Sequence, residues 1–450
     1  MKCRFRYVEC QFNALRRAKN RKQLDECLRT LPRDLDETYE RILCSINDEY
    51  VEDVRRVLTL LCFSTRPLTV NELIEAHSVD LSEPPQLDRD RSYDPDGLVD
   101  ICLGLIELVA AEDDNRQTTW TVRIAHFSVQ EYLQSDRISQ QNSKVFAMRS
   151  SHANTEIARI CLVYLLEPNF YQGVLDERKL TEFPFAHFAA MYWFHHYENS
   201  ERKKVVEMLA LNLFKDEKAF ISWIRLHDID VGFEASQDFH RPIVEIAAPL
   251  YYAALLGLEL VLNSVLPIDT RDSEPSETVN AQGGRYGNAL KAAANRGHES
   301  IVQMLLDRGA DVNAQGGKCG NALQAAAEEG HESIVKMLLD RGANVNTRGG
   351  RYGNALKAAA NRGYESIVQM LLDRGADVNA QGVLDSNALY AAADGGHESI
   401  VQMLLDRGAD INAQGREYGN ALYAAADGGH KSIVQMLLDR DADVNSQVDE

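Results

Sequence analysis

Features that mark membrane proteins, secreted proteins and metal sites are missing from this sequence of 450 residues. No apolar run approaches the roughly 18 residues that cross a bilayer, and residues 1–22 contain no apolar segment of signal-peptide length. The 8 cysteines are scattered and form no Cys-x-x-Cys pair, which disfavours zinc and dithiol centres. A reduced setting fits this cysteine usage. We therefore expect a cytoplasmic protein without membrane association, and a nuclear location stays open.

Positive charge is also scarce. The 48 Lys and Arg residues stand against 68 Asp and Glu residues, for a formal net charge of −20. Such a chain repels nucleic-acid phosphates and anionic lipid surfaces, so both partner classes are disfavoured. Apolar residues make up 45% of the sequence, which supports packed cores, and the length allows two or three domains.

Motifs that hold a nucleotide or activate a nucleophile are absent as well. A P-loop needs a glycine-rich turn followed by Lys and Ser or Thr, so that backbone N–H groups and the lysine hold the phosphates. The one Gly-Lys pair, Gly317-Lys318, is followed by Cys319 and has no glycine five residues before it. Gly-x-Ser-x-Gly, the nucleophile elbow of α/β hydrolases, does not occur either. We therefore predict a chain that is not an enzyme and holds no cofactor or metal.

A phrase repeated five times with a period of 33 residues dominates the second half of the chain. Asn-Ala-Leu recurs at one position of each unit and Asp-Arg at another, which is the signature of a repeat architecture. The regular units are 281–313, 314–346, 347–379, 380–412 and 413–445, and a degenerate unit over 248–280 precedes them.

Each unit predicts two short helices. In the first unit Asn288 caps a helix over Ala289–Asn295, because its side-chain oxygen can accept a backbone N–H. Gly297 permits a turn before a second helix, Glu299–Asp307, which ends at Gly309 in the left-handed region. One unit cannot bury its apolar stripe alone, so the units should stack into an α-solenoid.

The segment Gly297–Asn313 resembles the ankyrin repeat, and the likeness covers all five units. Where ankyrin units usually have Thr-Pro-Leu-His, this chain has Asn-Ala-Leu followed by Lys, Gln or Tyr. Asn can replace Thr as a cap, whereas the Thr–His hydrogen bond is lost. An extended, glycine-rich finger, such as Asp311–Gly320, leads from each unit to the next. The resemblance implies that a protein partner binds the tips of these fingers and the inner helices on the concave face.

Variation among the units marks candidate partner-binding positions. The second helices barely differ, as a shared core requires, whereas the finger and first-helix positions do. Tyrosine suits an interface because its large ring has a polar tip. Neutral drift after duplication is the alternative, since 283–297 and 349–363 are identical. The candidates, expected to project from one concave side, are Arg285, Tyr286, Lys291, Lys318, Gln324, Arg351, Tyr352, Lys357, Leu384, Tyr390, Glu417, Tyr418 and Tyr423.

The first half predicts a helical segment over 1–50, a winged-helix domain over 51–138 and a helical domain over 139–247. Strands near Ile106–Ala111 and Trp120–Ala125, joined by the turn Asp113–Arg116, form the wing. The expected helices are Val54–Cys62, Val70–Ser78, Asp96–Leu105, Ser128 to about Arg137, Thr155–Leu166, Phe183–Tyr197, Val205–Phe214 and Lys218–Leu226. The fold class is thus mainly α, with one small α+β domain.

Two other readings of this half are disfavoured. Residues 67–135 hold 14 acidic and 4 basic side chains, and the expected recognition helix Gly97–Leu105 has no Lys or Arg, so DNA binding is not predicted. His187, His195 and His196 suggest a metal site. The adjacent pair points to different helix faces, however, and no Asp, Glu or Cys completes a recognisable ligand set.

Three phrases, Leu31–Leu43, Phe63–Thr69 and Ile124–Leu133, resemble in order the end of a fungal NACHT–ankyrin protein, a relative of NOD-like receptors. The winged helix is also similar to the type found in GPI inositol-deacylase proteins. In NOD-like receptors an NTPase domain precedes the winged helix, and the resemblance makes His126 a candidate nucleotide sensor that reaches a phosphate. The alternative is that His126 ends a strand and caps the next helix.

Three hypotheses about function follow. The leading one is a non-catalytic regulator in which the ankyrin array binds a protein partner and the winged-helix and helical domains form a platform. The second is a free-standing ankyrin scaffold. The third is a fragment of a NACHT-type signalling ATPase whose P-loop domain lies upstream. The sequence leaves the partner, the trigger and the oligomeric state open.

Overall fold

The computed structural model describes residues 21, 34–112, 118–231, 238–266, 276–382, 387–414 and 419–444. The predicted turn Asp113–Arg116, most of the segment 1–33, and the candidates Leu384, Glu417 and Tyr418 lie outside these residues. The described residues divide into two compact units, an N-terminal unit within 1–227 with 238–239, and a repeat unit formed by 228–231 and the chain from 240 onward. The prediction of a mainly helical chain with one small α+β region is confirmed.

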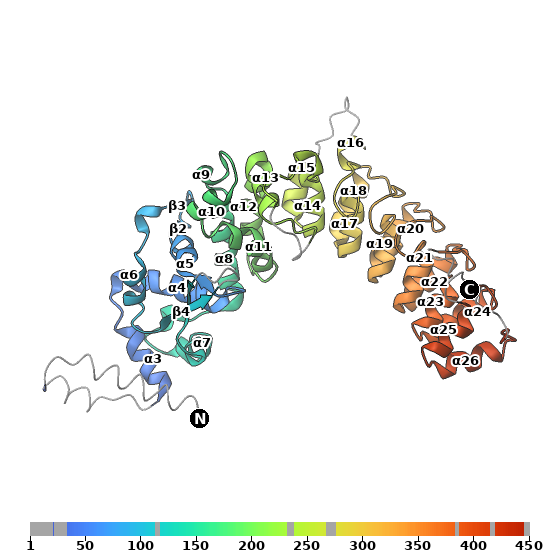
Figure 1. Ribbon diagram of the computed structural model, residues 1–450, viewed down its shortest axis with the longest axis horizontal. Coiled ribbons are helices and arrows are strands. Elements are labelled where there is room, and N and C mark those ends of the chain that lie inside the picture. Colours follow the sequence, from blue (N-terminus) through green and yellow to red (C-terminus); the bar gives the residue numbers. More distant parts are fainter. Residues whose placement is uncertain are drawn as a thin grey trace. The chain divides into compact units, whose positions relative to one another are not determined.

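The first part of the N-terminal unit combines helices with a small sheet (Figure 1). The helices are α3 (Leu35–Cys44), α4 (Val51–Phe63), α5 (Val70–His77), α6 (Pro95–Ile101) and α7 (Phe127–Leu133). The strands are β1 (Leu68–Thr69), β2 (Val79–Asp80), β3 (Gln86–Leu87), β4 (Ile106–Glu112) and β5 (Thr118–Ile124). An antiparallel sheet has the order β1-β5-β4, and β2 pairs with β3. The predicted hairpin is therefore confirmed, whereas β1, β2 and β3 were missed.

The helix starts in this part follow capping chemistry. Thr69 and Glu72 form the predicted capping box of α5, and Asp94 caps α6 with Pro95 in its first turn. The sequence predicted α6 to continue to Leu105, but it ends at Ile101. The backbone turns left-handed at Leu103, where φ is +49°, and at Gly104, where φ is +80°, and a right-handed helix cannot continue through such residues.

The second part of the N-terminal unit is helical. Its helices are α8 (Ser150–Leu165), α9 (Pro168–Tyr171), α10 (Glu177–Glu182), α11 (Ala186–Glu198), α12 (Lys203–Lys215) and α13 (Glu217–Leu226). Helix α8 is buried on most of its surface because it packs against α11 and α12 as well as against α4 and α5. Trp193 of α11 and Trp223 of α13 meet edge to face with ring centroids 5.5 Å apart. The winged helix and the helical region therefore share one core.

The repeat unit is a stack of helix pairs that stand side by side (Figure 1). The pairs are α14 (Pro249–Leu256) with α15 (Glu259–Val265), α17 (Ala289–Arg296) with α18 (Glu299–Asp307), α19 (Ala322–Glu329) with α20 (Glu332–Asp340), α21 (Ala355–Arg362) with α22 (Glu365–Asp373), α23 (Ala388–Asp394) with α24 (Glu398–Asp406), and α25 (Ala421–Asp427) with α26 (Lys431–Leu438); the short α16 (Ser276–Val279) precedes α17. First helices pack on first helices and second helices on second helices. The two helices, the Asn288 cap and the left-handed Gly309 of the first regular unit are as predicted, and Gly297 also has a positive φ. The helix pair α14 and α15 lies within the predicted degenerate unit.

Polar contacts repeated at the same spacing connect neighbouring units. The Asn313 side chain donates to Gly342 O at 3.2 Å and accepts from the backbone N–H of Asn344 at 2.8 Å, and equivalent pairs recur along the stack. Each Asp-Arg phrase contributes an ion pair, such as Arg341 with Asp307 at 2.9 Å. The phrases that reveal the period in the sequence are thus the ones that fasten each unit to the next.

The last unit departs from the pattern at one position. Asp441 stands where the other units have glycine, and its φ is +62°, so it occupies the left-handed region as predicted. Restoring glycine by Asp441→Gly should stabilise the unit by about 1 kcal/mol, since this conformation strains a residue with a Cβ. We expect slower hydrogen exchange across Ser432–Arg440. Equal or faster exchange in the variant contradicts this expectation.

Candidate functional site

Fingertips and the ends of the first helices lie on the same side of the repeat unit. The backbone N–H of Lys318 donates to Arg285 O at 3.0 Å, so adjacent fingertips are in direct contact. Burial raises the pKa of Tyr286, and the nearby Arg296 and Arg285 both oppose that rise, which places the end of α17 beside the fingertip. We call this surface the fingertip face. Its exposed charged residues in the first three regular units are Arg285, Arg296, Lys318, Glu329, Arg351 and Arg362.

The structure separates the candidate partner-binding residues into three groups. Arg285, Lys318, Arg351 and Tyr423 are exposed, and Tyr352 and Tyr390 are half-buried. A second group is buried, contrary to the expectation that all candidates project from the surface; it consists of Tyr286, Lys291, Gln324 and Lys357. Leu384, Glu417 and Tyr418 form the third group, which lies outside the described residues.

Two of the buried polar residues fasten one finger to the next. Lys291 Nζ donates to Gly316 O at 3.0 Å, and burial lowers the pKa of this amine. Gln324 accepts the backbone N–H of Asn321 at 3.1 Å and donates to Thr347 O at 2.9 Å. Both side chains, which follow the Asn-Ala-Leu phrase, therefore donate to a carbonyl oxygen of the following finger. A long polar side chain remains buried at this position because the following finger supplies a carbonyl oxygen.

The fingertip face also contains residues that the comparison of units did not select. Arg296 and Arg362 are exposed in the last turns of α17 and α21. The signal that would have found them was present, because this position also varies among the units, which have Arg296, Glu329, Arg362, Gly395 and Gly428 there.

His126 has a clear structural role in the N-terminal unit. It is the N-cap of α7, and its Nδ1 accepts the backbone N–H of Ser128 at 3.2 Å. The Ser128 hydroxyl lies 2.6 Å from the same nitrogen and 2.8 Å from the hydroxyl of Tyr39 on α3. The ring is therefore used to join the end of β5 to α7, and a contact between His126 and a nucleotide phosphate stays an untested prediction.

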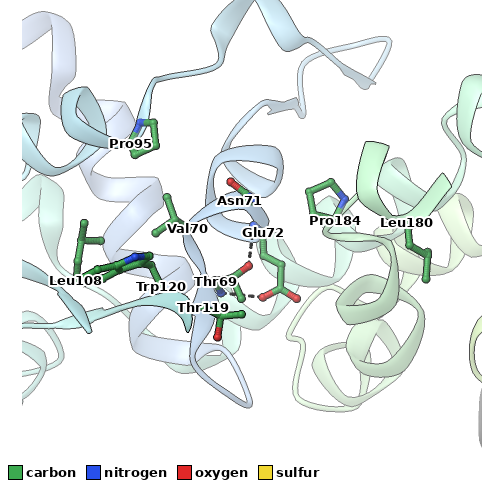
Figure 2. A pocket seen from close by; sticks show the side chains of 10 residues that line it. All are labelled: Thr69, Val70, Asn71, Glu72, Pro95, Leu108, Thr119, Trp120, Leu180 and Pro184. Atoms are coloured by element: carbon green, nitrogen blue, oxygen red, sulfur yellow. Dashed lines mark hydrogen bonds between the residues drawn. The ribbon is translucent and has the colours of Figure 1, made fainter. Parts of the chain in front are cut away.

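A groove of about 670 Å³ lies between the wing and the helical region (Figure 2). Figure 2 shows Leu108 and Trp120 of the wing on one side and Leu180 and Pro184 on the other. The lining is mainly apolar, and Trp120 is 53% exposed. Glu72 Oε2 accepts from Arg66 at 2.9 Å and from the backbone N–H of Thr69 at 2.8 Å, and Oε1 accepts from Arg66 at 2.5 Å. Its proton-accepting oxygens are therefore engaged, and the groove suits an apolar group better than acid–base chemistry.

Two further features of the N-terminal unit are the helix considered for DNA recognition and the histidines considered for a metal site. Helix α6 contains Asp96 and Asp100 and no basic residue. His196 Nδ1 lies 2.6 Å from Asn154 Oδ1, a contact with an amide rather than a metal-binding partner. No group of three or more His, Cys, Asp or Glu residues that could hold a metal ion occurs within the described ranges. Among those residues there is also no helix whose length and apolar character would let it cross a membrane.

Comparisons with known proteins agree with this architecture. Residues 39–149 match the family described as GPI inositol-deacylase, winged helix domain. Residues 250–349, 290–382 and 356–448 match three copies of the family described as ankyrin repeats. The chain carries a GPI inositol-deacylase-type winged helix followed by ankyrin repeats. The fingertip face therefore belongs to an ankyrin array, an architecture that generally has the capacity to bind proteins.

A curated relative shares much of this sequence. The protein named azaphilone pigments biosynthesis cluster protein L, from Monascus ruber, is 58% identical over 299 residues, which are 65% of this chain and 63% of the relative. The chain thus spans somewhat less than two thirds of the length of the curated relative that it matches. The ankyrin array and the winged helix are the two parts of this chain that the family comparisons identify.

Proposed function

We propose that this chain is a non-catalytic regulatory protein whose ankyrin array binds a protein partner through the fingertip face. The observation that carries the proposal is the contrast within the array. Inter-unit contacts repeat almost unchanged from unit to unit, whereas exposed side chains at the fingertips and on the first helices differ. A framework that holds a variable exposed surface is suited to recognising another protein.

Tyr390 and Tyr423, on the first helices of the last two units, extend this surface. Tyr423 is 53% exposed on α25, and Tyr390 is half-buried at the equivalent position of α23. Both replace the long polar side chains that are buried in the preceding units. An exposed tyrosine offers a large contact area with a polar hydroxyl group and little rotamer entropy to lose, which are the properties of interface anchors.

The curated relative supports a setting for this activity. Because that protein is named for a pigment biosynthesis cluster, we propose that the partner of this chain also acts in the production of such pigments. The rival proposal, a fragment of a NACHT-type signalling ATPase, requires a nucleotide-binding partner domain. Sequencing of the coding region upstream of this chain separates the two, since an in-frame P-loop supports the ATPase fragment and its absence supports the non-catalytic regulator.

The binding proposal predicts loss of the partner when the tyrosines are truncated. The variant Tyr352→Ala/Tyr390→Ala/Tyr423→Ala should retain less than about a tenth of the partner captured by wild type, as expected for interface anchors. The matched control is Gln369→Ala/Gln402→Ala/Gln435→Ala, which alters the second helices of the same three units. Capture from native extract is quantified by mass spectrometry, and circular dichroism checks folding. A well-folded tyrosine variant that retains every partner rules out this surface.

A further inference from the structure

Five basic residues of the fingertip face are exposed, and their side chains form no ion pair with a described residue. Arg285, Lys318 and Arg351 occupy the same fingertip position in three successive units, and all three are exposed. Arg296 and Arg362 are exposed at the ends of the first helices of the first and third of these units. Among the described residues no side chain of the five forms an ion pair, although the Asp230 carboxylate accepts the backbone N–H of Arg285 and so lies close to that residue.

Arginines elsewhere in the same array behave differently. Arg341, Arg407 and Arg440, which follow the second helices, each pair with an aspartate of the preceding unit at 2.9, 2.7 and 3.1 Å. The chain has a net charge of −20, so acidic side chains are abundant. The arginines that follow the second helices are therefore paired between units, whereas several cations without an ion pair gather on the fingertip face; elsewhere in the array the exposed lysines Lys336 and Lys431 also form no ion pair with a described residue.

A stabilising role accounts for only part of this pattern. A cation in the last turn of a helix interacts favourably with the helix dipole, which explains Arg296 and Arg362. The fingertip cations lie outside any helix and gain nothing from this effect. The Arg351 guanidinium is held 5.5 Å from the centroid of the Tyr352 ring, which orients it without neutralising its charge.

The positive charge is confined to one part of the face. In the second of the three units, the exposed Glu329 occupies the position that Arg296 and Arg362 have at the ends of their helices. Its Oε1 accepts from Asn295 Nδ2 at 3.4 Å. In the fourth and fifth units the helix-end arginine is replaced by Gly395 and Gly428, each preceded by an exposed aspartate, Asp394 or Asp427. A ligand that lies along the array therefore meets mainly positive charge over the first three regular units, interrupted by Glu329, and the aspartates Asp394 and Asp427 beyond them.

We propose that the fingertip face over units 281–379 binds an acidic segment of a partner protein. This inference rests on the proposed function and adds the chemistry of the partner. Carboxylates of the segment pair with the three fingertip cations, and Arg can do so through two parallel N–H donors. A short acidic segment fits within the basic part of the face. A nucleic-acid strand, with a uniform charge along its length, extends from there to Asp394 and Asp427, which repel its phosphates.

The test uses the purified full chain and a fluorescent peptide in which Glu alternates with Gly. Fluorescence anisotropy should show binding to wild type that weakens when salt is raised from about 50 mM to about 300 mM, because exposed ion pairs are screened. The variant Arg285→Glu/Lys318→Glu/Arg351→Glu should bind at least about tenfold more weakly. The control Lys204→Glu/Lys336→Glu/Lys431→Glu makes the same change of net charge at three exposed lysines that form no ion pair with a described residue and lie outside the fingertip face, and it should bind like wild type.

Each other outcome overturns the inference. Absence of peptide binding to wild type, or equal weakening in both variants, shows that these fingertip cations do not form an acidic-segment site. Tighter binding of a labelled oligouridine strand than of the peptide assigns the face to nucleic acid instead. If the peptide fails while tyrosine-dependent capture of a partner persists, the array binds protein through other chemistry, and the proposed function stands without this inference.

Discussion

Replacing Gly317 with alanine should destabilise the ankyrin array by roughly 3 kcal/mol, whereas the same change at Gly309 should cost about 1 kcal/mol. Both glycines have positive φ, +72° and +84°, so both pay the penalty of placing a Cβ in the left-handed region. They differ in their surroundings. A Cβ at Gly317 lies 2.1 Å from Tyr286 O of the preceding finger, and a Cβ at Gly309 has no neighbour within 4 Å.

The difference between the two variants isolates the contact between fingers. A backbone carbonyl cannot move aside as a flexible side chain can, so the fingers must separate and strain the hydrogen bond from Lys318 N–H to Arg285 O. Urea unfolding followed by far-ultraviolet circular dichroism measures both losses. Equal destabilisation by the two alanines contradicts the close approach at Gly317. Because the fingertip cations flank this contact, Gly317→Ala should also weaken binding of the acidic peptide.

The repeat fold could be predicted almost to the residue because its determinants are local. A cap at Asn288, glycines at 297 and 309 and a 33-residue period each act within one unit or between neighbours. The positions of Lys291 and Gln324 could not be predicted in the same way. Lysine and glutamine are usually exposed, and only the three-dimensional structure shows that the next finger supplies carbonyl partners for them.

In the N-terminal unit, too, local features were predictable from the sequence, whereas contacts between residues far apart in the sequence were not. Its helix caps were predictable from Thr69, Glu72 and Asp94, whereas the shared core around α8 was not. The ion pair between Arg55 on α4 and Glu156 on α8, 3.3 Å apart, joins residues about a hundred positions apart in sequence. Periodicity predicts that α8 is a helix, but carries no information about which helices cover its faces.

For one candidate site the sequence predicted the location but not the kind of ligand that its residues suit. Variation among units selected Arg285, Lys318 and Arg351, and the structure places all three on the fingertip face. Only the structure shows that these three side chains form no ion pair with a described residue, whereas Arg341 and its equivalents have aspartate partners one unit away. Sequence alone cannot distinguish a paired arginine from an unpaired one when acidic residues outnumber basic ones throughout the chain.

Acid should destabilise the N-terminal unit through His196. Its ring is fully buried, Asn154 Nδ2 donates to Ser150 O, and His196 Nδ1 therefore donates to Asn154 Oδ1. His196 Nε2 is buried and has no hydrogen-bond partner among the described residues. Burial, followed by repulsion from His195, lowers the pKa of His196 to about 3. Protonation in the folded state would place an unpaired positive charge in this core.

The sign and the pH range follow from this shift. The unfolded chain takes up the proton near pH 6.5 and the folded chain only near pH 3, so stability is complete above 6.5 and falls as the pH decreases towards 3. Burial likewise lowers the pKa of His77 to about 4, which adds a second loss between 6.5 and 4. At about 1.4 kcal/mol per pH unit, His196 alone should remove about 3 kcal/mol between pH 7 and 4.5.

The change His196→Gln should remove that part of the pH dependence, because glutamine does not titrate. Urea unfolding at pH 7 and at pH 4.5 gives the slope for wild type and variant. The 3 tryptophans, Trp120, Trp193 and Trp223, all lie in the N-terminal unit, so tryptophan fluorescence reports its unfolding without a contribution from the array. His77→Gln provides an independent second case with its own range. If His196→Gln loses as much stability between the two pH values as wild type, the buried imidazole is not the group that acid protonates.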